Sequence, residues 1–268
     1  MILTTDLALL AGAGAVVGLL VGSFLNVVIH RVPLGLSVVN PPSACPRCGH
    51  RIRARENVPV VSWLLLRGRC SGCQGRISAR YPAVEAGTGL LFGAVTALVG
   101  PSWELPAYLY LSALVVCLTL IDLDVRRLPD TIVKPAYPVT LLLLLVPAWI
   151  GGEWSSLFRA AIAGVVLWAV YALLFLIWPG GMGLGDVKLA GVLGAYLGWW
   201  GWSALAVGGF AAFLLGGVVG VALVVRGAGR KTKIPFGPYM LAGAMLALFV
   251  GAPVAQWYLN LVGLPAAG

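Results

Sequence analysis

The sequence predicts an all-α polytopic membrane protein of about eight transmembrane helices with one small polar insertion. Hydrophobic residues make up 60% of the 268 positions and charged residues only 10%, whereas soluble domains average about 45–50% and about 25%. The apolar residues gather in runs of helix-spanning length that are separated by short polar breaks. One break alone, residues 32–81, is long enough to be a separate module. A water-soluble fold is therefore not expected.

The apolar runs define the expected membrane spans. The first run has no basic segment before it and is longer than the core of a signal peptide, so we interpret it as a retained span. The run at 187–200 is short, and Gly201 divides it only weakly from the next run. The eight runs are about 7–29, 83–99, 106–121, 131–150, 157–178, 187–200, 202–225 and 236–262.

Positive charge is concentrated beside the ends of the spans. The formal net charge is +9, and nine basic residues lie between Arg31 and Arg80. Positive charge marks cytoplasmic loops, so eight spans with both termini outside leave only Arg159 near an outside end. We therefore interpret the charge as a topology signal and expect no nucleic-acid binding. A second basic cluster consists of Arg226, Arg230, Lys231 and Lys233.

Four cysteines in the polar insertion form two CxxC pairs. The pairs are Cys45-Pro-Arg-Cys48 and Cys70-Ser-Gly-Cys73, with 21 residues between them, close to the spacing of a zinc site built from four thiolates. Two disulfides or a redox pair are the alternatives, which a reducing cytoplasm disfavours. We expect structural zinc that supplies much of the folding energy of this segment. Three regions follow: a first transmembrane helix at 1–31, a cytoplasmic zinc-binding module at 32–81 and a membrane core at 82–268.

Residues near the cysteines are assigned secondary roles. Gly49 and Gly72 allow the tight turns that point backbone amides at the sulfurs. His30 and His50 are not needed as ligands, because four cysteines complete a zinc shell. Cys117 lies in an apolar span and is interpreted as a buried, inert thiol.

Two aspartates at span ends are the candidate catalytic residues. Asp122 ends one apolar run and Asp186 begins another, and the expected topology places both at the cytoplasmic side. Ionisable residues at membrane depth are costly and indicate function, although an interfacial acid or a helix cap is the alternative for either residue alone. Two close carboxylates share one proton. Such a pair can activate water with one carboxylate and polarise a carbonyl with the other, as aspartic proteolysis requires.

The surroundings of the two aspartates suggest supporting residues. Gly183 and Gly185 precede Asp186 in a GxGD sequence and let a substrate backbone approach the acid. Lys188 is expected to stabilise the carboxylate of Asp186 or to anchor at the membrane interface. The remaining acids receive structural roles: Asp124 as a partner of Arg126 or Arg127, Asp130 as a helix cap, and Glu85 as a helix-start or interfacial residue.

The ordered combination of these motifs resembles the bacterial prepilin peptidases, the type IV leader peptidase family of GxGD aspartic proteases. The matching stretches cover most of the chain. They are Gly22-Ser23-Phe24-Leu25-Asn26-Val27-Val28-Ile29-His30-Arg31, the two CxxC pairs, Glu56-Asn57-Val58-Pro59, Ser62-Trp63, Ile77-Ser78-Ala79-Arg80-Tyr81-Pro82, Ile121-Asp122, Leu128-Pro129-Asp130 and Gly183-Leu184-Gly185-Asp186-Val187-Lys188.

The resemblance implies a membrane enzyme of the bacterial inner membrane with Asp122 and Asp186 as its catalytic pair. Its substrates would be type IV prepilins and type II secretion pseudopilins, cut on the cytoplasmic side after a short basic leader. Full-length members also methylate the new N-terminus with S-adenosylmethionine. Gly68 and Arg69 are the methylation candidates by resemblance, with arginine where the family commonly has lysine. The loop carries no glycine-rich cofactor fingerprint that would indicate methyl transfer independently.

Three other interpretations fit part of the sequence. A presenilin-like protease also uses an aspartate pair with GxGD, but the zinc module and the Leu128-Pro129-Asp130 sequence argue against it. A transporter could use the intramembrane acids to bind protons or cations. An enzyme with catalytic zinc is disfavoured, because four cysteines close the metal shell and no HExxH motif occurs.

Overall fold

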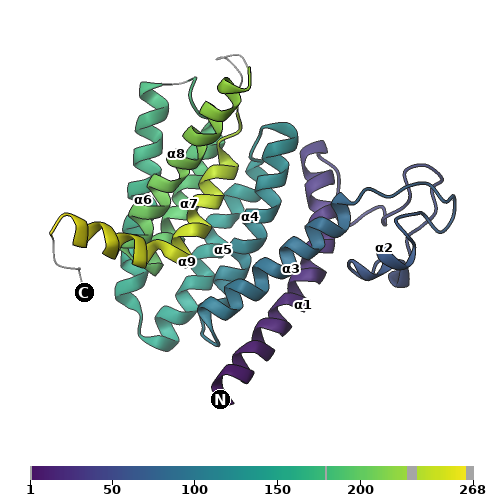
Figure 1. Ribbon diagram of the computed structural model, residues 1–268, viewed down its shortest axis with the longest axis horizontal. Coiled ribbons are helices and arrows are strands. Elements are labelled where there is room, and N and C mark those ends of the chain that lie inside the picture. The colour runs from purple at the N-terminus through teal and green to yellow at the C-terminus, as the bar shows by residue number, and fades with distance from the viewer. Residues whose placement is uncertain (1, 179, 228–233, 264–268) are drawn as a thin grey trace. The chain divides into compact units, whose positions relative to one another are not determined.

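The computed structural model describes residues 2–178, 180–227 and 234–263, and this part of the chain is helical (Figure 1). It contains no strands, only isolated bridges that pair Ala44 with Arg51 and Arg69 with Arg76. Arg230, Lys231 and Lys233 of the second basic cluster lie outside the described residues. The helices are α1 (Ile2–Arg31), η1 (Val32–Leu34), η2 (Ala54–Glu56), α2 (Val61–Leu65), α3 (Arg80–Val99), α4 (Leu105–Val125), α5 (Asp130–Gly151), α6 (Trp154–Ile177), α7 (Leu184–Trp200), α8 (Trp202–Val225) and α9 (Gly237–Leu261).

All eight apolar runs form helices, which confirms the all-α membrane class. Within the described residues, seven helices are long and apolar enough to cross a membrane. The exception is α7, which has 17 residues, near the lower limit of about 17–25 for a span. Most of its side chains are buried by protein. That α7 crosses the bilayer by itself stays a prediction.

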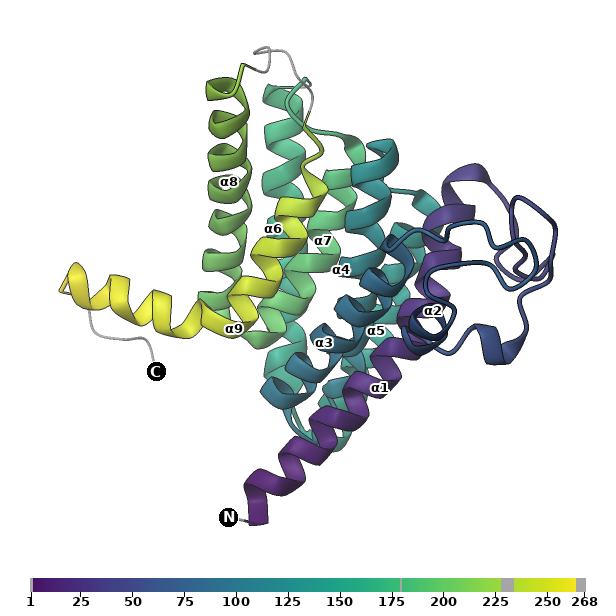
Figure 2. The same ribbon diagram turned by 45° about the vertical axis from the view of Figure 1, so that its right-hand side comes forward.

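The chain divides into two compact units, Met1–Cys117 and Leu118–Gly268. In the first unit α1 and α3 lie side by side (Figures 1 and 2). Their close approach depends on Gly18 and Gly22, one turn apart on α1: a Cβ at Gly18 would lie 2.8 Å from the Cα of Gly89, and one at Gly22 would lie 2.8 Å from the Cα of Glu85. Small residues at four-residue spacing are a common device for packing membrane helices.

In the second unit α7 packs against α5, α6, α8 and α9. Glycine again allows the contact, since a Cβ at Gly194 would lie 2.6 Å from the carbonyl oxygen of Ala163 on α6. Helix α9 changes direction along its length (Figure 2), and Pro253 lies inside it. Proline removes a helical hydrogen bond and explains such a bend.

Arg159, the basic residue near an outside end, closes the C-terminus of α7. Its guanidinium donates hydrogen bonds to the carbonyls of Gly198 (2.6 Å) and Trp199 (2.7 Å) and to the hydroxyl of Ser156 (3.2 Å). The last carbonyls of a helix lack partners within the helix, and a cation there also stabilises the helix dipole. Arg159 therefore has a structural role at the end of α7, which explains why it departs from the cytoplasmic location expected of the other basic residues.

We expect Arg159→Met to destabilise the second unit by about 2–3 kcal/mol, because it leaves two part-buried carbonyls without their charged donor. The measurement is the thermal unfolding midpoint of the purified protein in detergent. Arg226→Met, at an exposed site, is the matched control and should leave the midpoint unchanged. Equal midpoints for the two variants would show that the cap contributes nothing.

Candidate active site

Asp122 lies near the C-terminal end of α4, where the chain turns toward α5. Its side chain is buried, with 4% of the residue exposed, and its Oδ2 accepts a hydrogen bond from the Gly237 backbone amide at 3.1 Å. Gly237 is the first residue of α9, and Pro238 follows it. Amides at a helix N-terminus are free to bind an anion, and the helix dipole favours negative charge there. The start of α9 therefore positions the Asp122 carboxylate.

Asp186 occupies the first turn of α7 and is held in a similar way. Its residue is 7% exposed, and its Oδ2 accepts a hydrogen bond from the Gly183 amide at 2.8 Å. Gly183 is the N-cap of α7. A Cβ at Gly185 would lie 3.0 Å from the Cβ of Leu128, so the GxGD glycines here let α7 begin close against the segment that joins α4 to α5.

The two carboxylates are close enough for the charge of Asp122 to act on Asp186. The Leu128 side chain packs beside both aspartates. It contacts Gly185, the residue before Asp186, and a Cβ added at Gly237, the residue that binds Asp122, would lie 3.3 Å from it. This shared contact explains how the two carboxylates come together. Two buried, interacting carboxylates favour a state in which one proton is shared. The pair can then present one ionised and one protonated oxygen to a substrate.

An aromatic cluster lies beside the pair. Tyr171 on α6 is buried, and its ring packs at a tilt against Phe213 and Phe236, at centroid distances of 5.4 and 6.2 Å. Its hydroxyl is near enough to Asp186 for the two groups to interact electrostatically. Phe236 directly precedes Gly237 and thereby helps to fix the start of α9. Neither Tyr171 nor Gly237 was expected from the sequence to belong to the site. The Gly237-Pro238 pair carried a usable signal, since proline in the first turn marks a helix start.

Lys188 does not bind Asp186, contrary to one of the roles expected for it. Residues two apart on a helix point in different directions, and the Lys188 ammonium instead contacts both carboxylate oxygens of Asp130, at 2.7 and 3.0 Å. Lys134 contacts the same carboxylate at 2.8 Å. The Tyr137 hydroxyl donates a hydrogen bond to the carbonyl of Lys188 at 2.5 Å. These contacts fasten the first turn of α7 to α5.

Asp130 is also not the helix cap that the sequence suggested. The N-cap of α5 is Pro129, and Asp130 is the first helical residue. Its carboxylate is engaged by the two lysines instead of by a backbone amide of its own helix.

We expect Gly237→Ala to lower the turnover number for the proposed proteolysis by about 10²-fold, the typical cost of moving a catalytic group by about 1 Å. The added Cβ would lie 2.7 Å from Asp122 Oδ2, so the carboxylate must shift. The measurement is single-turnover cleavage of a substrate. Gly217→Ala on α8, where a Cβ meets nothing within 4 Å, is the control. An unchanged rate in Gly237→Ala would remove Gly237 from the site.

The four cysteines of the first unit form a cluster that could hold a metal ion. Their sulfurs all lie within 4.8 Å of one another, with Cys45 to Cys73 at 3.9 Å and Cys48 to Cys70 at 4.0 Å. Four thiolates around one zinc ion at about 2.3 Å would be about 3.8 Å apart, so the donor set fits such an ion. All four are free thiols rather than disulfides.

Two similar turns carry the cysteines. The Cys45 amide donates to the His50 carbonyl, and the Cys70 amide donates to the Gly75 carbonyl, both at 2.9 Å. In the first turn Gly49 has φ +71°; in the second, the equivalent residue after the CxxC is Gln74, with φ +55°. The left-handed residue of the second turn is therefore Gln74, whereas Gly72 lies inside the CxxC pair. Gly72 instead makes room for His50, whose Cβ would be 3.1 Å from a Cβ there.

Backbone amides already favour thiolate in this cluster. Those of Arg47 and Cys48 hydrogen-bond to the Cys45 sulfur and lower the pKa of its thiol to about 6. In the same turn the His50 amide lowers the pKa of the Cys48 thiol, but burial and the neighbouring cysteine side chains raise it to about 11. A metal ion requires thiolate ligands, so Cys45 is the thiol of this turn that is most readily available for binding.

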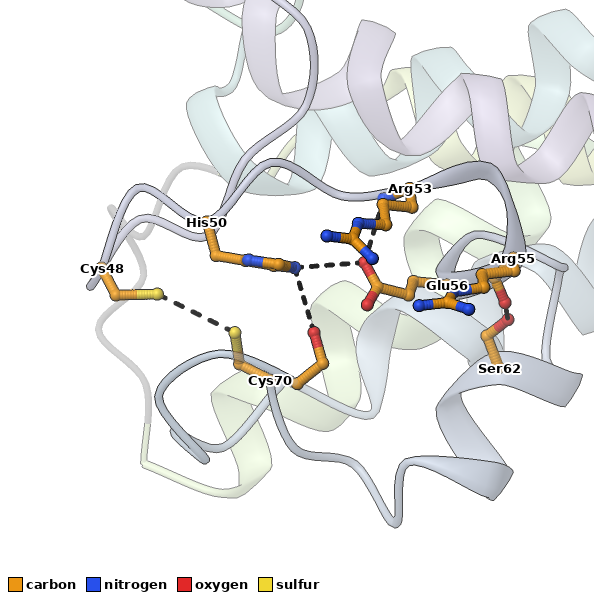
Figure 3. Close-up of polar contacts among 8 residues, drawn as sticks. Cys48, His50, Arg53, Arg55, Glu56, Ser62 and Cys70 are labelled. Carbon is orange, nitrogen blue, oxygen red and sulfur yellow. Dashed lines mark hydrogen bonds and ion pairs between the residues drawn. The ribbon is translucent and has the colours of Figure 1, made fainter.

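His50 is not a ligand in this arrangement but ties the two turns together (Figure 3). Its Nε2 lies 3.2 Å from Glu56 Oε2 and 3.1 Å from the Ser71 hydroxyl. The Arg53 amide, the Ser71 hydroxyl and the His50 ring lower the pKa of Glu56 to about 2. Because this folded-state pKa lies below the ordinary value of 4.5, the stabilising effect is fully present above about pH 4.5 and is lost as the pH falls toward 2.

The methylation candidates lie in the turn after α2. Gly68 has φ +66°, and a Cβ there would lie 2.9 Å from the Trp63 ring. The Trp63 indole donates to the Ile77 carbonyl at 3.2 Å, and the Ile77 amide donates to the Gly68 carbonyl at 2.7 Å. Gly68 is thus required by the local packing, whereas Arg69 is exposed.

The fold and the site define a class: a multi-pass membrane protein with a buried pair of interacting aspartates at helix ends and a separate four-cysteine module. Residues 16–99 match the Bacterial Peptidase A24 N-terminal domain, and residues 109–225 match the type IV leader peptidase family. The chain belongs to the type IV leader peptidase family.

Curated relatives match this chain over most of its length. Proteins named "Prepilin leader peptidase/N-methyltransferase" are 40% identical in Aeromonas hydrophila, over 90% of this chain and 91% of the relative, and 41% identical in Pseudomonas aeruginosa, over 92% of each. One in Burkholderia pseudomallei is 39% identical over 92% of this chain and 87% of the relative. No solved structure matches.

Proposed function

We propose that this protein is an aspartic endopeptidase of the membrane that removes the leader from type IV prepilins and pseudopilins and then methylates the new N-terminus. The observation that carries the proteolytic half is the pair of buried, interacting carboxylates, each held by a backbone amide. The relatives' shared name supports both activities. The comparisons give no support to the transporter interpretation.

The geometry suggests how the pair would act. With one proton between Asp122 and Asp186, the ionised carboxylate takes a proton from water as the water attacks the scissile carbonyl. The protonated carboxyl donates to the carbonyl oxygen, and a proton then passes to the leaving amine. The amides of Gly183 and Gly237 keep both carboxylates oriented, so little reorganisation is needed during the reaction.

Methylation would follow on the amine that cleavage exposes. S-adenosylmethionine would supply the methyl group: the amine nitrogen would form a bond to the methyl carbon as the sulfur–methyl bond breaks, S-adenosylhomocysteine would leave, and the amine would lose one proton to water. Gly68 and Arg69 are the proposed participants in this step. The packing of Gly68 on Trp63 supports a role in shaping the loop, and the exposed Arg69 guanidinium supports a role in binding.

We assign zinc to Cys45, Cys48, Cys70 and Cys73 as a structural ion, because four thiolates leave no open coordination position. The distribution of basic residues supports a place in the bacterial inner membrane with the module at 32–81 and both aspartates on the cytoplasmic side. The proposed regions are 1–31, 32–81 and 82–268.

Purified protein in lipid, given a panel of type IV prepilins with S-adenosylmethionine, tests both halves. We expect a product shortened at its leader, with a mass gain of one methyl group that disappears when S-adenosylmethionine is omitted. Cleavage without any methyl gain would refute the second activity alone. If prepilins from many systems all remained intact while the enzyme was folded, the proteolytic proposal would be wrong.

A further inference from the structure

Glu85, for which the sequence suggested a helix-start or interfacial role, is a buried carboxylate that has a partner outside its own helix. It lies in the second turn of α3, is 8% exposed, and its Oε2 accepts a hydrogen bond from the Val60 amide at 2.7 Å. Val60 belongs to the polar module, immediately before α2. A carboxylate of a membrane helix therefore holds the backbone of the module.

The packing of α1 on α3 shows how deep in the membrane the contact between Glu85 and Val60 lies. A Cβ at Gly22 would lie 2.8 Å from the Cα of Glu85, and Gly22 precedes the last residue of α1, Arg31, by nine residues. At 1.5 Å per residue the contact lies about 13 Å back along α1 from its end. The apolar run of α1 continues to Ile29 and that of α3 begins at about residue 83, so Glu85 lies just inside the expected span and Val60 reaches the level of the membrane boundary.

Val60 adopts a conformation that unrestrained valine avoids. Its φ and ψ are +61° and −49°, and the Val61 amide donates to the Pro59 carbonyl at 2.6 Å, which makes a γ-turn with positive φ. This turn is rare and costly for a β-branched residue, and such strain persists only where the surroundings fix it. The bond to Glu85 is the fixing contact, and it starts α2 at this depth.

Helix α2 presents apolar side chains that are largely exposed in the described part of the chain. Val61, Leu64 and Leu65 are 51%, 60% and 78% exposed. Two exposed arginines, Arg67 and Arg69, follow them within one turn. Apolar side chains beside arginines are the pattern of a segment that lies in a membrane interface, with arginine on the lipid phosphates.

We propose that α2 docks on the cytoplasmic surface of the bilayer. Val61, Leu64 and Leu65 insert at the boundary of headgroups and acyl chains, Arg67 binds phosphates of anionic lipids, and Glu85 holds the element at that depth through Val60. Continuity with the membrane-spanning face of α1 and α3, together with charge complementarity to anionic lipid, selects the bilayer as the occupant. The consequence is a four-cysteine module fixed against the membrane rather than free above it.

Photo-crosslinking in lipid nanodiscs tests this docking. The full chain carries p-benzoylphenylalanine at Leu65 or, as the matched control, at Ile52, another exposed apolar residue of the module. Nanodiscs contain phosphatidylcholine alone or mixed with phosphatidylglycerol, and mass spectrometry identifies the adducts. We expect lipid adducts at 65 and few at 52. In the mixed lipid, Arg67→Gln should lower the adduct yield at 65 by about fivefold, as one arginine near an anionic surface predicts.

Two substitutions test the Glu85 contact separately. Glu85→Gln keeps an oxygen that accepts from Val60 and should retain the lipid adducts, whereas Glu85→Leu should lose most of them while the metal content stays at the wild-type level. Adducts at 65 with protein instead of lipid, or equal lipid adducts at 65 and 52, would overturn the proposal. Adducts that are insensitive to Glu85→Leu would refute the tether.

Discussion

Asp122→Asn and Asp186→Asn should each abolish prepilin cleavage, with a loss of about 10⁴-fold in turnover number. Asparagine has nearly the same shape and keeps an oxygen that can accept from Gly237 or Gly183, so the local structure should survive. It cannot take a proton from water or donate one as a carboxylic acid does. Removal of general acid–base catalysis costs about 10²- to 10⁴-fold for one group, and here either substitution ends the shared-proton state that both groups need.

Single-turnover cleavage is the measurement, with the thermal midpoint and metal content as checks of folding. Asp124→Asn is the matched control, because Asp124 is on the same helix but exposed, and it should retain activity. Methylation of a substrate that has already been cleaved should continue in both catalytic variants, since the proposed methylation residues lie elsewhere in the chain. Near wild-type cleavage by either variant would remove that aspartate from the catalytic pair.

The second large effect is expected at the cysteine cluster, where removing one cysteine should unfold the module. Binding of a structural zinc ion contributes about 10–16 kcal/mol in small four-ligand modules, and this segment has little apolar core to replace it. Cys48→Ser and Cys70→Ser each remove one ligand from a different turn. The contacts of His50 with Glu56 and Ser71 remain, but exposed hydrogen bonds contribute far less than the metal.

Elemental analysis and limited proteolysis follow this loss. We expect one zinc ion per wild-type chain, almost none in either serine variant, and new cleavage sites in the module. Cys117→Ala should keep the zinc, because Cys117 is buried in α4 and belongs to no cluster in the described chain. A serine variant that kept its zinc and its protease resistance would contradict the four-cysteine site.

The predictions that depended on local pattern were the secure ones. The apolar runs became helices because the cost of exposing a polar backbone to lipid leaves a long apolar segment no other structure. The CxxC spacing predicted the cysteine cluster because two short turns suffice to bring four sulfurs together. The exceptional position of Arg159 was visible in the sequence, but its reason, the open carbonyls of α7, was not.

The predictions that failed all concerned partners. One of the two roles expected for Lys188 was to stabilise Asp186, its near neighbour in the chain, but its ammonium binds Asp130, 58 residues away. Glu85 was expected to have a helix-start or interfacial role, and its contact with Val60, across 25 residues, was not expected. In each case a residue's sequence neighbours were a poor guide to the group that its side chain meets.

The sequence by itself determined the membrane class, the helical runs, the cysteine cluster and the two candidate aspartates, because composition and short spacings report directly on solvent preference and local geometry. Only the tertiary structure decided that Gly237, 115 residues from Asp122, orients its carboxylate, and that Tyr171 lies beside Asp186. Such contacts depend on how whole helices pack. Packing is set by the fit of many small surfaces at once and leaves no periodic signal in the chain.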